Sequence, residues 1–578
     1  MVIRTRNIKT KRKYFNELII VVLAIILLSQ FTSFSFFRVD LTTEKRFSIS
    51  NSSREILRGL DDVVYVRVYL DGELPNDLVH FRENIKESLI EFRAYAGKNL
   101  EFEFINLYDE KDIELRNKMM GDLADKGLKV TDIQHRDSEG GLTTKIIFPG
   151  AIFSFRNVDF PVNLLKNNPA LPYRENIANS VQSLEYEFIR AIKSITNTKI
   201  EKVAFIEGHG EFDFWETYDI SSELSLFFQV DRGVIGGNLE NVLDYKALII
   251  ARPTTRFSEA DKFVLDQYLM NGGKLLFFLD PVEANEDSLI SGQTYTKFRD
   301  LNIYDLLFKY GVRVSYNLVK DFQCNYKRIQ TSVNNQEPRT TVLPWWYSPL
   351  VTASSENIIT KGLNYIKTDY VSAIDTTAGQ ISGLKRTVLL SSSDTSALIN
   401  NPVYISMDEV TRPPDRSVFV NSSLALAILS EGEFPSFYRN YSIPSGVAEF
   451  SIPVLNSSKH TSVFVSGDAD IIRNDVHVQN NQFIPQPLGY DRDTRQTFGN
   501  KEFIMNVVNY MCDDMALISL RSREYKLRLL DVLKLRKKQE KLKWILINTL
   551  LPVLIIVLIG WLYNLRRKLK YSKKYLKI

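Results

Sequence analysis

The chain is poor in the residues that build covalently linked or metal-bound scaffolds. Two cysteines in 578 residues cannot form a disulfide framework or a zinc-ribbon array. With 26 glycines and 19 prolines, the composition also excludes collagen-like and low-complexity chains. A hydrophobic content of 44% argues against intrinsic disorder, so the sequence predicts an ordinary globular protein of three or four domains.

Several motifs with well-defined chemistry are missing. There is no GxxxxGKS or GxxxxGKT phosphate loop, so any ATP hydrolysis must come from another chain. The absence of CxxC excludes thiol redox chemistry, and no HxH or HExxH spacing occurs that would indicate a metal site. The sequence therefore predicts no cofactor and no metal.

Positive charge is concentrated in three short segments. Residues 1–13 hold six basic residues, 534–543 hold six beside one acid, and 565–578 hold seven. Without these segments the chain has 54 basic and 68 acidic residues, so its body is acidic. An acidic body gives little electrostatic support for binding nucleic acid, and we expect no nucleic-acid partner.

Two uncharged runs of 20 residues, 18–37 and 544–563, are each long enough to cross a bilayer as a helix. The second has Trp544 at one end and Trp561 and Tyr563 at the other, where aromatic rings favour the membrane interface. Buried core helices are the alternative for both runs, and a cleaved signal peptide is a further alternative for the first. The sequence favours two transmembrane helices.

The basic residues before the first run place the N-terminus in the cytoplasm by the positive-inside rule. Two spans return the C-terminus to the same side, so residues 1–17 and 564–578 are predicted to be cytoplasmic tails. The chain between the spans is then extracytoplasmic. Its last part, 516–543, is predicted to be a juxtamembrane basic helix that either contacts anionic membrane lipid or forms a solvated stalk.

The first extracytoplasmic domain, 38–172, has the pattern of an α/β unit of thioredoxin-like size. Alternation predicts a strand at 63–70, and helical spacing predicts a helix at 83–96. The elements expected after these are a strand at 100–106, a helix at 112–126 and strands at 128–133 and 143–155. A long amphipathic helix within 173–200 is predicted to link this domain to the next.

The second domain, 201–515, alternates strands and helices. Short apolar strands are predicted at 202–206, 245–251 and 274–279, with a helix capped by Ser258 between the last two. This spacing indicates an α/β fold with a doubly wound, mostly parallel sheet. The region from 321 to 460 gives only a mixed α/β pattern, and an apolar helix is expected at 503–511.

Doubly wound sheets bind ligands at the carboxyl ends of their strands, where the loop after the strand at 202–206 lies. The candidate ligand-binding residues are therefore Glu207, Gly208, His209, Gly210 and Glu211. His209 could be a general base or a metal ligand. Alternatively, the glycines permit a tight turn and the histidine only satisfies backbone carbonyls.

No catalytic nucleophile fits this architecture, which resembles the class I glutamine amidotransferase-like fold. The nucleophile elbow of that fold needs a Cys or Ser on a tight strand-to-helix turn between small residues. Neither Cys324 nor Cys512 has that context, and Ser466 lacks a leading glycine and a histidine partner. We therefore expect no catalytic residues and a protein that is not an enzyme.

Trp345 and Trp346 belong to the aromatic run PWWY and are candidate docking residues. An exposed run of this kind would form a docking or ligand-stacking patch. Large aromatic residues are also common in protein cores, so burial is the alternative.

Five segments of the chain together resemble one family. They are DLTTEKRFSIS, VRVYLDGELP, EFRAY, IEGHGE and GNKEFIMNVVNYM, at 40–50, 66–75, 91–95, 206–211 and 499–511. In order and spacing these segments are similar to the GldG family, the gliding-motility-associated ABC transporter components. The resemblance covers nearly the whole chain, with both predicted spans in the expected places.

The resemblance implies a non-catalytic accessory subunit of an ABC transporter in the bacterial inner membrane. Its partners would be an ABC permease, a cytoplasmic ATPase and an unidentified periplasmic substrate or envelope protein. The resemblance also implies an ectodomain related to an intraflagellar-transport-type, amidotransferase-like module that is used for binding. Two rival hypotheses remain: a membrane-anchored periplasmic hydrolase that uses His209, and a structural envelope tether.

Overall fold

The computed structural model describes most of the chain between residues 49 and 572. The described residues are 19–20, 23, 49–136, 142–165, 173–196, 200–285, 288–289, 292–331, 339–353, 357–361, 363–375, 383–411, 414–479, 482–512 and 538–572. The chain divides into two compact units, residues 1–523 and 524–578. The first predicted span, 18–37, lies outside the described residues apart from 19, 20 and 23, as does most of the segment 516–543.

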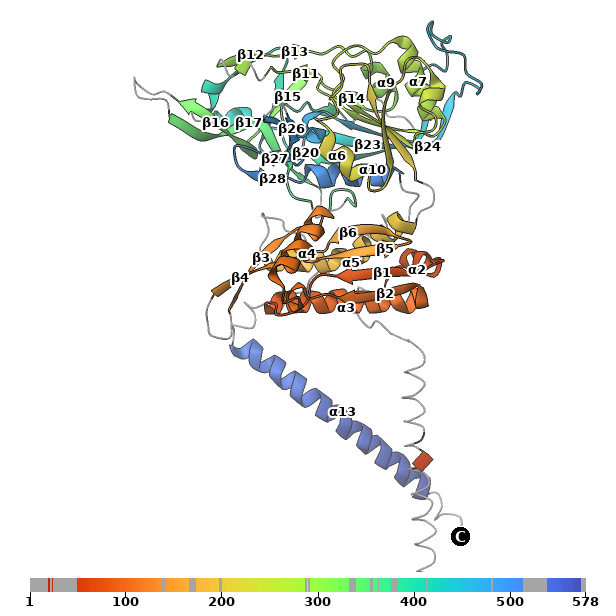
Figure 1. Cartoon of the computed structure of the whole chain (residues 1–578), viewed down its shortest axis with the longest axis vertical. Coiled ribbons are helices and arrows are strands. Elements are labelled where there is room, and N and C mark those ends of the chain that lie inside the picture. The colour runs from red at the N-terminus through yellow and green to blue at the C-terminus, as the bar shows by residue number, and fades with distance from the viewer. Residues whose placement is uncertain are drawn as a thin grey trace, which may run out of the picture. The chain divides into compact units, whose positions relative to one another are not determined.

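The N-terminal part of the first unit is a mixed four-stranded sheet with the order β2-β1-β5-β6 (Figure 1). Strand β1 pairs in parallel with β2 and antiparallel with β5. The helix predicted at 83–96 begins earlier than expected, at Asn76. The elements are α2 (Asn51–Arg58), β1 (Val64–Val68), α3 (Asn76–Ala96), β2 (Leu100–Phe104), α4 (Ile113–Asp125), β3 (Thr131–Arg136), β4 (Leu142–Ile147), β5 (Gly150–Phe155), β6 (Val158–Asn163) and α5 (Tyr173–Thr196).

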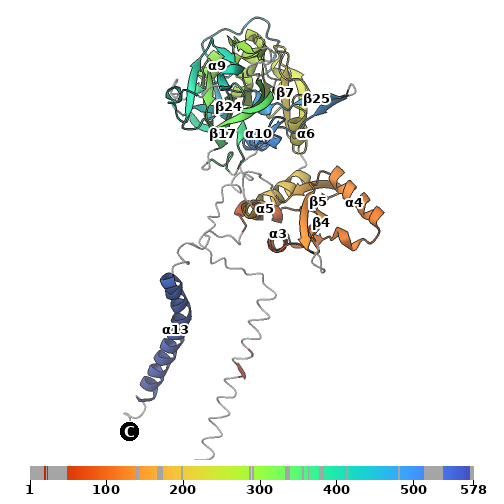
Figure 2. The same ribbon diagram turned by 90° about the vertical axis from the view of Figure 1, so that its left-hand side faces the viewer.

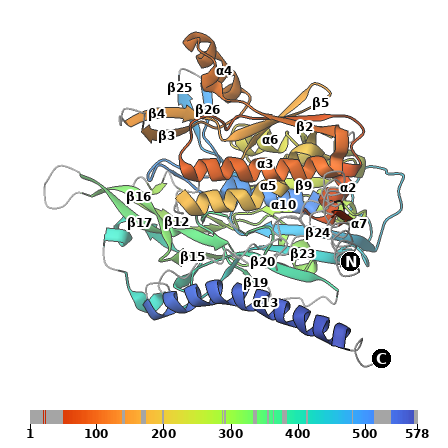
Figure 3. The same cartoon turned by 90° about the horizontal axis from the view of Figure 1, so that it is seen from below.

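Helices α3 and α5 lie side by side against this sheet (Figure 3). Phe188 of α5 packs against Phe92 of α3 and Phe153 of β5, with ring centroids 5.5 Å from each. On the opposite face of the sheet, Ile152 of β5 and Leu123 of α4 belong to a smaller apolar cluster. The long helix expected within 173–200 therefore forms, and its apolar face supplies one wall of the N-terminal core.

The second part of this unit is built on one large sheet with the order β16-β17-β20-β23-β24-β10-β9-β7-β8. The five strands from β8 to β24 are parallel to one another, which confirms a doubly wound parallel core. The other four continue the sheet antiparallel. The strands are β7 (Lys202–Glu207), β8 (Gln229–Val234), β9 (Ala247–Ala251), β10 (Lys274–Phe278), β16 (Cys324–Thr331), β17 (Arg339–Ala353), β20 (Lys385–Ser391), β23 (Ala425–Pro435) and β24 (Ser457–Ser466).

Numbered along the chain, the parallel strands lie in the order 2-1-3-4-5, which is the order of flavodoxin-like sheets. Strand β7 comes first, β8 pairs with one of its edges, and β9 pairs with the other. The direction of winding reverses between β7 and β9, so their carboxyl ends form the topological switch point of the sheet. The predicted ligand-binding loop, 207–211, follows β7 and lies at this point.

Residues of β7 alternate between two cores. Val203 and Phe205 belong to the cluster that includes α6 (Tyr218–Leu224) and α10 (Asn500–Cys512). Ala204 and Ile206 belong to the opposite cluster, which includes α7 (Glu259–Met270) and α9 (Tyr304–Lys309). Because helices cover both faces, the strand needs apolar side chains on both sides and appears in the sequence as one continuous apolar run.

The region from 321 to 460 consists of strands and short 3₁₀ turns, with no α-helix among its described residues. The mixed α/β pattern expected there is therefore wrong for this part. Figure 2 shows the β25–β26 hairpin projecting from the body. The remaining strands are β11 (Val282–Glu283), β12 (Gln293–Tyr295), β13 (Lys297–Phe298), β14 (Arg313–Val314), β15 (Asn317–Asp321), β18 (Ile366–Lys367), β19 (Ile374–Asp375), β21 (Ser396–Asn400), β22 (Tyr404–Ser406), β25 (Val476–Gln479), β26 (Gln482–Pro485), β27 (Tyr490–Asp491) and β28 (Gln496–Thr497).

The described part of the second unit is a single long helix, α13 (Lys538–Ser572), with Pro552 inside it. Its segment Lys543–Leu569 is long and apolar enough to cross a membrane, in agreement with the span predicted at 544–563. Within the described residues this is the one helix of that kind. The structure thus offers one candidate membrane helix where the sequence predicts two.

Candidate functional site

The loop after β7 makes the tight turn that its glycines predict. Gly208 and Gly210 have φ angles of +111° and +75°, which glycine adopts at little cost. Between them, the carbonyl of His209 accepts hydrogen bonds from the backbone N–H groups of Thr254 and Thr255, at 2.7 and 2.9 Å. The two loops at the switch point, after β7 and after β9, are therefore joined by backbone hydrogen bonds.

The His209 side chain fills the space between these loops. It is 7% exposed and stacks on Phe257, with ring centroids 3.9 Å apart. Its Nδ1 lies 3.3 Å from Oε1 of Glu211, and its Nε2 lies 3.3 Å from Oδ2 of Asp261. The ring thus contacts two carboxylates, whereas the sequence-based alternative had it satisfying backbone carbonyls.

This environment determines the charge of His209. Burial by itself lowers the pKa of the imidazole, but hydrogen bonds to Asp261 and Glu211 and their negative charges outweigh burial and raise the pKa to about 9. For Asp261 the effect of burial has the opposite sign and raises the pKa of the carboxyl. Hydrogen bonds from His209, Ser258 and the Gly237 amide outweigh burial and lower this pKa overall. At neutral pH the site is an imidazolium ion held between two carboxylates, and both ring nitrogens act as donors.

The two glutamates of the loop are also paired with other groups of the chain. Glu207 Oε1 lies 2.5 Å from Nε of Arg232, whose other nitrogens donate to Thr217 Oγ1 and to the Phe212 carbonyl. Glu211 Oε2 accepts the backbone N–H of His209 at 2.7 Å. All five predicted residues come together at the switch point, and the crevice that holds ligands in related sheets is filled by the chain itself.

Two acidic residues follow the next parallel strands. Asp280 comes after β10 and is partly buried, and Asp468 comes after β24 and is fully buried. Asp280 accepts the backbone N–H of Ala469 at 2.8 Å, while Asp468 accepts the N–H groups of Asp369 and Asp470. Burial, and for Asp468 the charges of neighbouring aspartates, raise the pKa of both carboxyl groups. These carboxyls hold the loop that follows β24 in place.

Ser466, the nearest sequence match to a nucleophile, takes part in this same turn. Its Oγ donates to the carbonyl of Asp468 at 2.8 Å and accepts the Asp468 N–H at 3.2 Å. Cys324 and Cys512 are free and buried, and burial together with the charge of Asp321 raises the pKa of the Cys324 thiol to about 12. None of the three has the geometry of an activated nucleophile.

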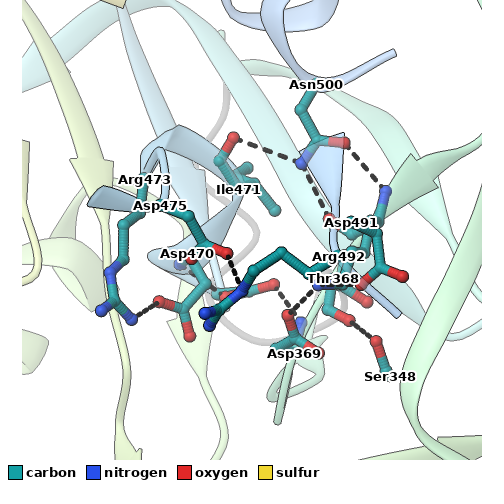
Figure 4. Close-up of polar contacts among 12 residues, drawn as sticks. Ser348, Thr368, Asp369, Asp470, Ile471, Arg473, Asp475, Asp491, Arg492 and Asn500 are labelled. Carbon is teal, nitrogen blue, oxygen red and sulfur yellow. Dashed lines mark hydrogen bonds and ion pairs between the residues drawn. The ribbon is translucent and has the colours of Figure 1, made fainter. Parts of the chain in front are cut away.

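An open pocket of about 210 Å³ lies beyond the carboxyl end of β24 (Figure 4). Segments far apart in the sequence line it: β16 and β17, the chain around β18, the loop after β24, the turn at β27 and the start of α10. Asn500 at the start of α10 ties two of them together, since its amide donates to the carbonyls of Lys367 and Ile471. This is the candidate functional site; its lining is Asn325, Tyr326, Lys327, Trp345, Ser348, Lys367, Asp369, Asp470, Arg473, Asp475, Gly489, Tyr490, Asp491, Arg492, Asp493 and Asn500.

Lys367 is the central charge of this pocket. Its Nζ lies 3.1 Å from Oδ1 of Asp491 and 3.2 Å from Oδ2 of Asp369. Burial opposes the charged form of Lys367, but the two carboxylates raise its pKa overall, and Lys367 in turn helps to lower the pKa of Asp491. The lysine is therefore a fixed cation and is unsuited to act as a base.

Two other cations of the pocket, Arg473 and Arg492, are also paired with carboxylates. Arg473 lies 3.4 Å from Asp470 and 3.2 Å from Glu216, and Arg492 lies 3.3 Å from Asp475. A singly charged ligand would have to compete with these internal pairs. The arrangement favours a polar ligand, or a protein side chain, that carries no net charge.

The two tryptophans predicted to dock a partner are 2% and 5% exposed. Trp346 packs near Phe419, with ring centroids 6.0 Å apart, inside a core cluster. Trp345 belongs to the same cluster and lines the pocket, and its buried Nε1 has no hydrogen-bond partner among the described residues. The two tryptophans thus offer little surface for docking, and the exposed part of Trp345 lies in the wall of the pocket.

A family model described as an ABC-type uncharacterized transport system matches residues 201–507, which is more than half of the chain. The chain belongs to this family. A second model, for a domain of unknown function, matches residues 43–154. The family indicates an accessory component of a transport system, and the apolar helix α13 indicates membrane association.

One relative and one solved structure complete the comparison. The chain is 23% identical over 348 residues to an uncharacterized protein of Borreliella burgdorferi, which covers 59% of this chain and 61% of the relative. The chain thus spans about three fifths of the length of that relative. The mmIFT52 N-terminal domain is similar with a TM-score of 0.32 and 13% identity, covering 55% of this chain and 99% of that domain.

The sequence predicted the switch-point loop but not the groups that pair with His209, nor the pocket beyond β24. Asp261 lies in the first turn of α7, the helix whose predicted cap is Ser258, and Ser258 Oγ accepts the Asp261 N–H at 3.0 Å. In a 2-1-3 strand order, the start of the helix after the third strand lies at the same edge as the loop after the first. That order was the signal that would have linked Asp261 to His209.

Proposed function

We propose that this chain is a membrane-anchored, non-catalytic accessory subunit of an ABC transporter of the GldG type, required for gliding motility. It works with an ABC permease and a cytoplasmic ATPase. One observation supports the proposal most strongly. The same chain has a body that belongs to an ABC-type transport family and an apolar helix long enough to span a membrane. The lack of a phosphate loop fits a separate ATPase subunit.

In this proposal the chain crosses the bacterial inner membrane twice, at 18–37 and 544–563, with both termini in the cytoplasm. The body lies in the periplasm, and the basic segment 516–543 contacts lipid headgroups as it enters the membrane. Movement driven by the ATPase reaches the body through that segment. The apolar length of α13 and the basic flanks in the sequence support this topology.

The body binds and does not catalyse. The strand order supports an amidotransferase-like fold, yet the switch point of the sheet is closed by His209 and its partners. A periplasmic substrate or envelope protein would instead contact the pocket around Lys367, where Trp345 forms part of the wall. The expected ligand carries no net charge, because the charges of the pocket are already paired.

The rival hypothesis is an anchored hydrolase that uses His209. A general base must be neutral at the working pH and must present a free ring nitrogen to its substrate. With a pKa of about 9 and a carboxylate at each nitrogen, His209 meets neither requirement. The other rival, a structural tether, needs no pocket and no transporter partners.

The deciding experiment is gentle detergent extraction of the tagged full-length protein from its native membrane, followed by mass spectrometry of the bound proteins. We expect a polytopic permease and an ATPase with a phosphate loop. Recovery of the chain alone, or with envelope scaffold proteins only, would overturn the proposal and favour the tether. A His209→Ala variant that assembles normally but abolishes gliding would favour the hydrolase.

A further inference from the structure

An open groove of about 550 Å³ lies on the body, separate from the pocket around Lys367, with which it shares no lining residue. Helix α9 and strand β14, which contact each other, form one side of it (Figure 1). The turn that follows β23 contributes the rest. Five aromatic side chains line the groove: Tyr304, Phe308, Tyr316, Phe437 and Tyr441.

Much of this aromatic surface is exposed. Phe308 is 47% exposed, Tyr316 45% and Tyr441 68%. The rings form two groups: Phe437 stacks with Tyr441, with centroids 5.8 Å apart, and Tyr304 contacts Tyr316 with centroids 5.4 Å apart. Exposed aromatic side chains gathered around a recess indicate a binding surface, because each ring buries a large apolar area when a partner covers it.

The charge left unpaired at the groove is positive. Asp305 is the one acid among the described residues that line it, and its carboxylate accepts a hydrogen bond from Nζ of Lys262 at 2.5 Å. Of the two cations in the lining, Arg313 is 62% exposed and lies 3.8 Å from Asp375. The other, Lys309, is exposed and has no ion pair with the described residues. The groove therefore differs in sign from the body as a whole, which is acidic.

The groove also offers hydrogen-bond donors that the described chain does not use. The hydroxyls of Tyr316 and Tyr441 have no hydrogen-bond partner among the described residues, and neither has Nζ of Lys309. A carboxylate accepts hydrogen bonds at both oxygens and carries the charge opposite to that of lysine. The groove thus fits an apolar or aromatic group that has carboxylates beside it.

We propose that this groove binds an acidic segment of a partner protein. An apolar or aromatic side chain of the segment enters between the rings, and Asp or Glu side chains on either side of it contact Lys309 and Arg313. An aromatic centre with a polar rim is the usual composition of a protein interface. The inference goes beyond the proposed function and does not depend on it, because the groove is separate from the pocket around Lys367.

Three other occupants fit the groove less well. Small-molecule sites bury about 70–90% of their ligand, whereas this groove is open and its rim is exposed. A membrane surface takes up apolar side chains that lie on a helix face, and here the apolar surface is recessed. A two-fold dimer would bring the same patch of two copies together, and a cationic patch is not complementary to itself.

Peptide binding tests the proposal directly. The full-length protein, in nanodiscs of neutral lipid, passes over three immobilised peptides of equal length. The first has a phenylalanine between two pairs of aspartates, the second has serine in place of the phenylalanine, and the third has lysines in place of the aspartates. We expect the first to bind at least about ten-fold more tightly than the others, and its affinity to fall as the salt concentration rises. Equal affinities, or no binding of the first peptide at about 1 mM, would overturn the proposal.

Variants then assign the binding to the groove. Lys309→Glu should weaken binding of the acidic peptide by roughly ten-fold and reduce its salt dependence. The matched control is Lys86→Glu, which makes the same change of net charge at an exposed position in α3. Tyr441→Ala should weaken binding by roughly ten-fold or more. Its control is Phe214→Ala, because Phe214 is 45% exposed and does not line the groove.

All four positions are exposed, so melting temperatures should stay near the wild-type value and show that each variant is folded. Equal losses of affinity in a variant and its control would overturn the assignment to the groove.

Further measurements distinguish the other occupants. Displacement of the acidic peptide by an equal concentration of 4-phenylbutyrate would indicate a small acid as the ligand. Binding to vesicles that contain phosphatidylserine, if Tyr441→Ala abolished it, would indicate a membrane surface. A dimer seen by native mass spectrometry that Tyr441→Ala dissociates would indicate a second copy. Each of these results would overturn the proposal.

Discussion

Two places at the same edge of one parallel sheet have opposite properties. At the switch point between β7 and β9, His209 and two carboxylates fill the crevice, and the side chain of His209 is 8% exposed. Beyond β24 the edge is open, and charged residues surround a pocket of about 210 Å³. The comparison teaches that the usual ligand position of a fold can be filled by the chain itself while another position at the same edge of the sheet remains open.

The physical difference lies in how the charges are satisfied. At the switch point, one buried cation lies 3.3 Å from the carboxylates of Glu211 and Asp261, which belong to two different segments. At the pocket, pairs such as Arg492 with Asp475 have side chains that are 61% and 37% exposed. Changes at the first place should therefore alter stability, and changes of exposed pairs at the second should not.

The largest effect is expected for Asp261→Ala. This change removes the carboxylate that contacts His209, Ser258 and the Gly237 amide, and leaves a buried cation with one partner. Loss of one member of a buried ion pair costs roughly 3–5 kcal/mol. Thermal unfolding of the purified full-length protein measures this loss of stability. The control is Asp244→Ala, because the Asp244 side chain is 84% exposed. Equal melting temperatures for both variants would contradict the structural role.

The loss of unfolding free energy on raising the pH is expected to be nearly as large as the loss caused by Asp261→Ala. The pKa of His209 is about 9 in the folded protein, against the ordinary value of 6.5 that it has in the unfolded chain. Its stabilisation is complete below pH 6.5 and is lost as the pH rises from 6.5 through 9, a total of about 3 kcal/mol. Melting temperatures over this range should fall for the wild type and less for His209→Gln. Parallel curves would show that His209 is not the responsible group.

A smaller loss is expected for Gly210→Ala. Its φ of +75° strains an alanine, and a Cβ there would lie 2.0 Å from Thr254 Oγ1. We expect a loss of roughly 2–3 kcal/mol from strain and overlap. Gly236→Ala is the matched control, because φ is +59° and nothing lies within 4 Å of its Cβ, so only about 1 kcal/mol should be lost. An equal loss in both variants would mean that crowding at Thr254 is unimportant.

The smallest effect is expected at the open pocket. Arg492→Gln removes a guanidinium that is 61% exposed, and such a pair contributes less than about 1 kcal/mol. We expect an unchanged melting temperature, measured beside the three variants of the switch point. A loss comparable to that of Asp261→Ala would show that the pocket charges also hold the fold together, and the contrast between the two places would disappear.

Much of the parallel core could be predicted from local patterns. The strand at 202–206, the cap at Ser258 and the helix near 503–511 depend on residues close together in sequence, and all three are present. The strands that extend the sheet at its antiparallel edge could not be predicted in the same way. Their partners lie up to 46 residues away, as for Lys385 and Glu431, and an alternating pattern does not show which strand pairs with which.

In the candidate site, too, local features could be predicted from the sequence and contacts between distant segments could not. The glycines on either side of His209 predicted a turn, because glycine at positive φ is a property of the residue itself. The contact between His209 and Asp261 joins positions 52 residues apart, and the pocket joins β16 to the start of α10. The burial of Trp345 and Trp346 likewise depends on strands that the sequence did not place.

The sequence by itself determined the apolar length of α13, the acidic body between basic segments, and the strands and caps of the parallel core. Composition and short-range periodicity suffice for these features, because they reflect the preference of each segment for lipid, water or a helical or extended backbone. Only the tertiary structure decided that His209 is a buried cation, that the switch point is closed, and that the open pocket lies beyond β24. Those properties arise from contacts between distant segments, which burial and charge pairing establish only once the sheet has formed.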